Sequence, residues 1–266
     1  MAVIGELSLP MVDILWADLE LGTLPFPLQV SGHGDTAEER DRIRRAVYTE
    51  LERRDLALYG RIGADLDYAL RLLAAPTISI DLVALPELTD PLPVRAVVAA
   101  RGKRAVLAVQ RELNLRLAMV RHSAIAASIV DLLPPNRYGP GPSVTLPAAQ
   151  VSRAPARVGR HRRDEPGGAV LRTATRQADR TAEQRWLDTI MERPVLRAGS
   201  FGLVLRDEHG KPQRLPGFGF FDTDQGRYAT SVSHGVDGED WTTLAPSDNP
   251  RLAHRLNELM LAALRE

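Results

Sequence analysis

The sequence contains no cysteine among its 266 residues. This absence excludes disulfides, thiol catalysis and cysteine-ligated zinc. No stretch approaches the roughly 20 apolar residues that span a bilayer. The N-terminal stretch Met1–Pro10 has no basic region ahead of an apolar run, unlike a signal peptide. We therefore expect a cytoplasmic protein without a membrane span.

Excess charge of either sign is also missing, because 34 basic and 34 acidic side chains balance. The chain as a whole therefore has no field that attracts nucleic acid or an anionic membrane. Hydrophobic residues make up 44% of the chain, which is enough to form a sizeable buried core. A chain of this length suits one large domain or two fused halves of about 130 residues each.

The first half begins with helical periodicity and then changes to extended segments. Thr36 and Glu39 form a capping box ahead of a long helix. Arg101-Gly102-Lys103 is typical of a hairpin turn. We expect helices at about 11–21, 36–54, 64–74 and 123–133, and strands at 77–85, 94–101, 104–110, 115–121 and 143–146.

The segment 148–180 interrupts this pattern. It holds eight arginines against three acidic residues, together with prolines and a Gly-Gly pair, and it contains no aromatic residue. Such a composition is typical of an exposed linker. A nucleic-acid-binding or lipid-binding arm is the alternative, although base stacking would require aromatic side chains.

The second half repeats the order of the first. Thr181 and Gln184 form a second capping box, and Asp248-Asn249-Pro250 starts the last helix. Strands are expected between them, at about 198–206, 217–222, 228–234 and 241–244. We therefore predict an α+β fold of duplicated helix–antiparallel meander–helix halves with pseudo-twofold symmetry. Residues 1–147 form the first half, 148–180 the linker and 181–266 the second half.

Three motifs suggest ligands, and each has a simpler interpretation. Gly32–Ala37 matches the dinucleotide pattern G-x-G-x-x-A, but no βαβ unit surrounds it, so a glycine turn before a capped helix is favoured. Asp222–Gly226 lacks the further ligands of a calcium loop, so a hairpin turn is favoured. The six histidines show no metal-binding spacing. We predict no metal, no cofactor and no catalytic residue.

The third motif, Pro216–Phe221, resembles the strand with which RNA-recognition domains stack bases, and Phe218 and Phe220 share one face of it. Its first position is proline and not basic, and a hairpin follows where that domain needs a helix. Core or interface packing is the favoured interpretation. An RNA-binding module that uses this strand and the arginine-rich segment remains the alternative function.

Several segments, in their order along almost the whole chain, resemble the EspG family of proteins associated with type VII (ESX) secretion. They are Trp16–Leu28, Arg95–Gly102, Ala105–Ala108, Leu132–Pro134, Gly139–Val144, Arg197–Gly202, Phe221–Tyr228, Asp237–Thr243, Ala245–Asp248, Leu252 and Arg255–Leu259. No single motif among them is diagnostic. Their order and their tandem layout carry the resemblance.

The resemblance implies a cytoplasmic chaperone without catalysis, which binds the helical tip of the PPE subunit in a PE–PPE heterodimer and directs it to its secretion system. It also implies a central sheet flanked by helical bundles, in a monomer or weak homodimer. The expected partner-binding side chains are Leu203, Phe218, Phe220, Leu256 and Met260. The alternative is that at least half of them are core residues. The loop at Pro86–Pro91 is a second candidate.

Overall fold

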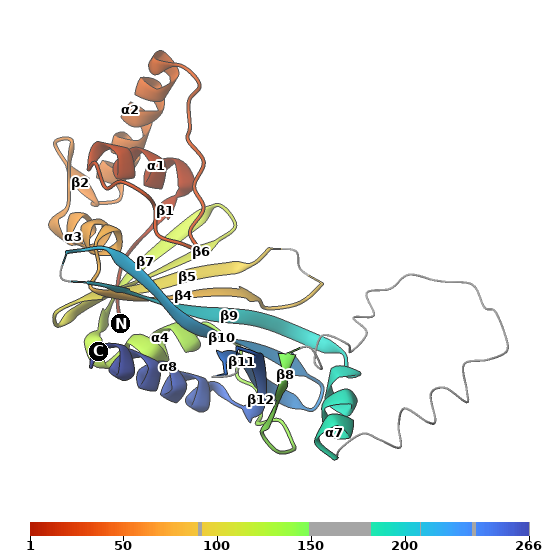
Figure 1. The fold of residues 1–266 in the computed structure, drawn as a ribbon. Coiled ribbons are helices and arrows are strands. Elements are labelled where there is room, and N and C mark those ends of the chain that lie inside the picture. The colour runs from red at the N-terminus through yellow and green to blue at the C-terminus, as the bar shows by residue number, and fades with distance from the viewer. Residues whose placement is uncertain (90–91, 149–181, 208, 236–237, 266) are drawn as a thin grey trace.

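The computed structural model describes residues 1–89, 92–148, 182–207, 209–235 and 238–265. Its centre is one ten-stranded antiparallel sheet, with helices on both faces (Figure 1). The strands are β1 (Ala2–Ser8), β4 (Ile78–Leu85), β5 (Val94–Arg101), β6 (Arg104–Arg111), β7 (Asn114–Arg121), β8 (Val144–Pro147), β9 (Val195–Arg206), β10 (Pro212–Thr223), β11 (Gly226–His234) and β12 (Asp240–Ser247). A separate small hairpin joins β2 (Ala57–Leu58) to β3 (Arg61–Ile62).

The helices divide between the two faces of the sheet. The described α-helices are α1 (Leu9–Asp18), α2 (Ala37–Arg53), α3 (Ala64–Ala74), α4 (Ile125–Val130), α7 (Ala182–Met191) and α8 (Asn249–Ala263). α1, α2 and α3 share one core with β5, β6 and β7. α4 and α8 share a second core with the opposite face. α7 covers a small third cluster on the outer strands of the second half.

The strand order shows that the two halves are equivalent. It runs β1-β7-β6-β5-β4-β9-β10-β11-β12-β8. Each half has an edge strand, then helical residues, a four-stranded meander and a final helix, and the edge strand pairs with the last strand of its meander. A pseudo-twofold axis therefore passes between β4 and β9, as the duplicated α+β fold predicts.

The two middle strands of the first meander, β5 and β6, are buried on both faces. Along β5, Ala96 and Val98 face the α4–α8 core, while Val97 and Ala99 face the α1–α3 core. Strands covered on both sides read as continuous apolar runs and do not alternate. This explains the run Ala96–Ala100 and the equally apolar run in β6.

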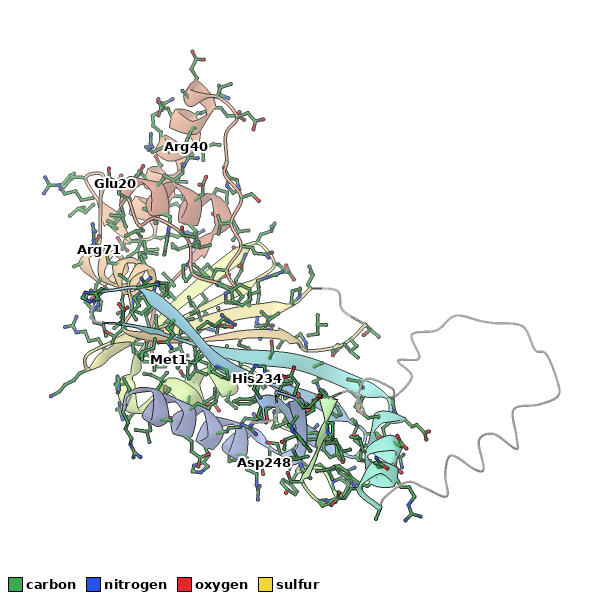
Figure 2. The ribbon with its side chains drawn as sticks, in the orientation of Figure 1. Met1, Glu20, Arg40, Arg71, His234 and Asp248 are labelled. Carbon is green, nitrogen blue, oxygen red and sulfur yellow. The ribbon has the colours of Figure 1, made fainter. Side chains whose placement is uncertain are left out.

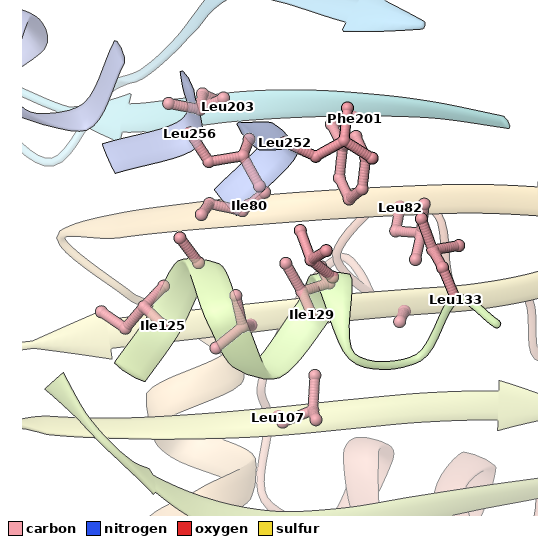
Figure 3. Packing of buried hydrophobic residues seen from close by; sticks show 14 of the residues in the cluster. Ile80, Leu82, Leu107, Ile125, Ile129, Leu133, Phe201, Leu203, Leu252 and Leu256 are labelled. Carbon is pink, nitrogen blue, oxygen red and sulfur yellow. The ribbon is translucent and has the colours of Figure 1, made fainter. Parts of the chain in front are cut away.

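The α4–α8 core draws on both halves of the chain. Figure 3 shows Leu252 and Leu256 of α8 and Ile125 and Ile129 of α4 packed over Ile80 and Leu82 of β4 and Phe201 and Leu203 of β9. Burial of these apolar side chains stabilises the junction, by about 25 cal/mol per Å² of surface removed from water. The two halves therefore share one core at their inner strands.

Two helix starts follow the sequence signals. The Thr36 hydroxyl accepts a hydrogen bond from the Glu39 amide at 3.2 Å, and the Glu39 carboxylate accepts one from the Asp35 amide at 3.1 Å. The Asp248 carboxylate caps α8 by accepting from the Arg251 amide at 2.9 Å, and Figure 2 shows Asp248 at the start of that helix. Each cap satisfies an amide that the helix leaves unpaired.

The structure differs from the expectations in three places. β8, which the sequence assigns to the end of the first half, pairs with β12 of the second half. β10 begins five residues earlier than predicted, because a bulge between Leu215 and Phe218 accommodates Pro216 and Gly217. Ser123 lies in a 3₁₀ turn and does not cap α4, which is shorter than predicted. The predicted linker lies, apart from Ala148, outside the described residues.

A fully buried ion pair fastens the β10–β11 hairpin to its surroundings. Asp222 and Arg227 both have 0% exposed side chains, and two guanidinium nitrogens reach the two carboxylate oxygens at 2.7 and 2.9 Å. Arg227 also donates to the carbonyl oxygen of Pro134, beyond α4, and to the Asn249 side chain at the start of α8. One guanidinium group therefore joins the hairpin to both helices of this core.

We predict that Arg227→Met lowers the free energy of unfolding by about 3–5 kcal/mol, because the fully buried Asp222 carboxylate loses both of its short hydrogen bonds and keeps only the longer contact with Arg197 at 3.5 Å. Urea denaturation followed by circular dichroism measures this change. The double variant Asp222→Asn with Arg227→Met should lose less than the two single variants added together. Arg193→Met removes an exposed ion pair with Asp224 and should cost at most about 1 kcal/mol. Equal losses for Arg227→Met and Arg193→Met would contradict the prediction.

Candidate partner-binding site

Five exposed apolar side chains gather where the inner strands begin and end. Leu88 and Leu92 lie in the β4–β5 connection, and Met191, Val195 and Leu196 lie at the end of α7 and the start of β9. Their exposed fractions run from 38% to 51%. The Leu88 amide donates to the Leu196 carbonyl oxygen at 3.1 Å, so the two segments are neighbours. We call these five residues the apolar patch.

The apolar patch continues along the sheet as a strip of small side chains. On the face opposite α4 and α8, β4 and β9 lie between the α1–α3 core and the α7 cluster. Ser200 is exposed there, and Val83, Val204 and Gly219 are partly exposed. A surface of this kind suits contact with another protein better than a small-molecule reaction.

An ion pair marks the far end of this strip. The Arg214 guanidinium donates to both carboxylate oxygens of Asp81, at 3.0 and 3.1 Å, and lies 5.1 Å from the centre of the Phe26 ring. Asp81 is buried, whereas the side chains of Arg214 and Phe26 are largely exposed. Burial raises the pKa of the Asp81 carboxyl, and Arg214 opposes the shift. The contact joins the loop after α1 to the second meander.

The side chains that the sequence nominated for partner contact lie mostly in the core. Leu203 and Leu256 are 0% exposed, and Phe218 and Phe220 are each 4% exposed. All four pack in the α4–α8 core, where Figure 3 shows Leu203 and Leu256. Met260 is partly buried at the rim of the same core. In this structure the first four hold the sheet to its helices and present no surface to a partner.

The structure also explains the three motifs that suggested ligand sites in the sequence. The rings of Phe218 and Phe220 pack against Phe201, with centroids 5.3 and 5.8 Å away, so neither ring offers a face to a base. The arginine-rich segment lies outside the described residues. Gly32–Ala37 is a loop that follows no strand and leads into α2. In the Asp222–Gly226 segment, Thr223 pairs with Gly226 across a hairpin turn.

Two further observations concern the described residues alone. Within them, no group of three or more His, Asp or Glu side chains is placed to hold a metal ion. Across the same ranges, no helix is long and apolar enough to cross a membrane.

Comparison with known proteins identifies the family. Residues 8–258 match the EspG family. The chain belongs to the EspG family. The match covers both halves and the segment between them. A search of the curated proteins gave no significant match.

A solved structure of an EspG protein has the same fold. The chain is similar to EspG5 of Mycobacterium tuberculosis, a type VII secretion system chaperone whose structure was solved in complex with a PE25–PPE41 dimer. The TM-score is 0.62 at 12% sequence identity, and the alignment covers 94% of this chain and 92% of the EspG5 chain. The central sheet flanked by helices, expected from the resemblance, is therefore confirmed.

Most residues of the apolar patch in this EspG-family chain were not identified from the sequence. Leu88 lies in the connection Pro86–Pro91, of which the structure describes residues 86–89, so one candidate segment contributes to the patch. Met191, Val195 and Leu196 gave no signal, because an apolar side chain at the end of a helix or strand usually packs inward. Pro194, which ends the helix, was the available hint that their surroundings change.

We predict that Arg214→Met destabilises the protein more at about pH 7 than at about pH 4.5. Without Arg214, the buried carboxylate of Asp81 loses its cation and its pKa rises further. A carboxyl group whose pKa is higher in the folded state than in the unfolded state stabilises the protein at low pH. That stabilisation is lost as the pH rises through the folded-state pKa. Urea denaturation at both pH values should show a cost that grows towards about 1–3 kcal/mol at the higher pH.

Arg71→Met is the matched control, because it removes an exposed ion pair with Asp67 on α3. Its cost should stay below about 1 kcal/mol at both pH values. A cost for Arg214→Met that shrinks with rising pH would show that Asp81 is not the group responsible.

Proposed function

We propose that this protein is a cytoplasmic chaperone of type VII secretion, which binds the PPE subunit of a PE–PPE heterodimer and keeps that heterodimer soluble. Membership of the EspG family is the observation that carries the proposal. The likeness of nearly the whole chain to EspG5, solved with a PE25–PPE41 dimer, supports it. On this proposal, the chain covers the helical tip of the PPE subunit and directs the pair to its secretion system.

The exposed surface of the chain suits this role. A helical pair with an apolar tip tends to aggregate unless another surface covers that tip. The apolar patch supplies apolar contact area, and the adjoining strip adds small side chains. A specific interface buries roughly 800 Å² on each partner, an area that requires the patch and the strip together.

The function is tested by co-expression of the full chain with PE–PPE pairs from the same genome, followed by affinity capture and size-exclusion chromatography. The proposal predicts a stable complex of one copy of each chain, with more soluble PPE protein than in expression without the chaperone. Failure of every pair to bind, with RNA copurifying instead, would refute the proposal and favour the RNA-binding alternative.

The location of the surface is tested separately. We predict that the double variant Leu88→Asp with Leu196→Asp weakens binding of a PE–PPE pair at least about tenfold, because two charges enter an apolar contact. Isothermal titration calorimetry measures the affinity.

Leu113→Asp places the same charge at a side chain 72% exposed in the β6–β7 turn, and serves as the matched control. It should bind like the unaltered chain. Normal binding by the double variant would exclude the apolar patch, while leaving the chaperone role itself untouched.

A further inference from the structure

An apolar cavity of about 170 Å³ lies between α7 and the outer strands of the second half. Its roof is formed by Leu187 and Met191, one turn apart on α7. Its walls come from β8, β10, β11 and β12. The remaining lining residues are Val144, Leu146, Phe221, Thr230, Thr242 and Leu244.

The lining of this cavity does not suit water. Six of the eight side chains are hydrophobic, Thr230 and Thr242 are the two exceptions, and none carries a charge. A buried water needs two to four polar partners. A dry cavity of about 150 Å³ with comparable walls in an engineered protein binds benzene or xenon. The present cavity has a similar volume and an apolar lining, but it is not sealed, because Met191 in its lining is 44% exposed.

Rigid contacts beside the cavity hold the helix away from the sheet. The Trp186 ring of α7 meets the Tyr228 ring edge-on, with centroids 6.1 Å apart, and Tyr228 stacks on Phe221 at 5.4 Å. Gly141 also lies against Trp186, where an added Cβ atom would come within 2.0 Å of the indole nitrogen. Trp186 therefore acts as a spacer that keeps α7 from closing onto the sheet.

A second cavity, lined by residues of both halves, provides a contrast. It measures about 10 Å³ and is lined partly by Arg197 and Arg227. Space of that size and polarity fits one water molecule. The cavity under α7 is therefore distinguished both by its volume and by its lack of charge.

We propose that the cavity under α7 is a binding site for a small apolar molecule, of the size of benzene or toluene or a short branched alkyl group. This inference is independent of the proposed chaperone function, because it rests only on the volume and lining of the cavity. Such a ligand replaces empty space with van der Waals contacts and stabilises the folded state.

The test uses the full chain with benzene as the probe, and follows both the thermal midpoint and the methyl NMR signals of Leu187, Leu244 and Met191. We expect a saturable rise in the midpoint and saturable shifts of those methyl signals. Thr230→Ile extends an ethyl group into the cavity and should weaken benzene binding at least about tenfold. Thr145→Ile makes the same change on an exposed side chain of β8 and should bind benzene like the unaltered chain.

Leu187→Phe fills the cavity from the helix side, so it provides a second variant if Thr230→Ile fails to fold. Benzene binding that is lost in either folded filling variant and kept in Thr145→Ile supports the proposal. It is overturned if the unaltered chain shows no saturable benzene binding, or if both filling variants bind benzene as well as Thr145→Ile does.

Discussion

The antiparallel pairing of β4 with β9 is the interaction on which the rest of the molecule depends. Eight residue pairs, from Ile78–Leu205 to Leu85–Ala198, join the inner strands of the two halves. This pairing makes two four-stranded meanders into one sheet and brings α4 and α8 together over a shared core. It also leaves the opposite face of β4 and β9 between two helical layers. The strip of small side chains follows from the same duplication that builds the core.

The buried pair of Asp222 and Arg227 connects the second half of the chain to the first through hydrogen bonds. The turn after β10 is exposed at Asp224, but Arg227 in β11 points inward and reaches residues that follow α4 and that begin α8. A charge without exposure is tolerated only with complete hydrogen bonding. Arg197 adds a third charge, with a nitrogen 3.5 Å from Asp222. The geometry of the hairpin is therefore fixed by chain segments distant in sequence.

Much of the fold could be predicted because local signals agreed with the global arrangement. β5 and β6 are apolar on both faces and joined by a short turn, and Thr36 and Asp248 cap their helices by local rules. β8 could not be predicted as part of the second half, because its partner in β12 lies about a hundred residues away. The burial of the side chains nominated for partner contact could not be predicted for a related reason. Periodicity shows that Phe218 and Phe220 share a face, but it does not show that α8 covers that face.

Hydrogen–deuterium exchange of the chain, with and without a PE–PPE pair, tests most directly the claim that partner binding uses the surface created by the β4–β9 junction. The account predicts slower exchange in the described part of the β4–β5 connection and in the first residues of β9, with α2 unchanged. Both segments have backbone amides at the proposed contact, and binding would exclude solvent from them. Protection confined to α2, or no protection anywhere in the presence of a pair that binds, would contradict the account.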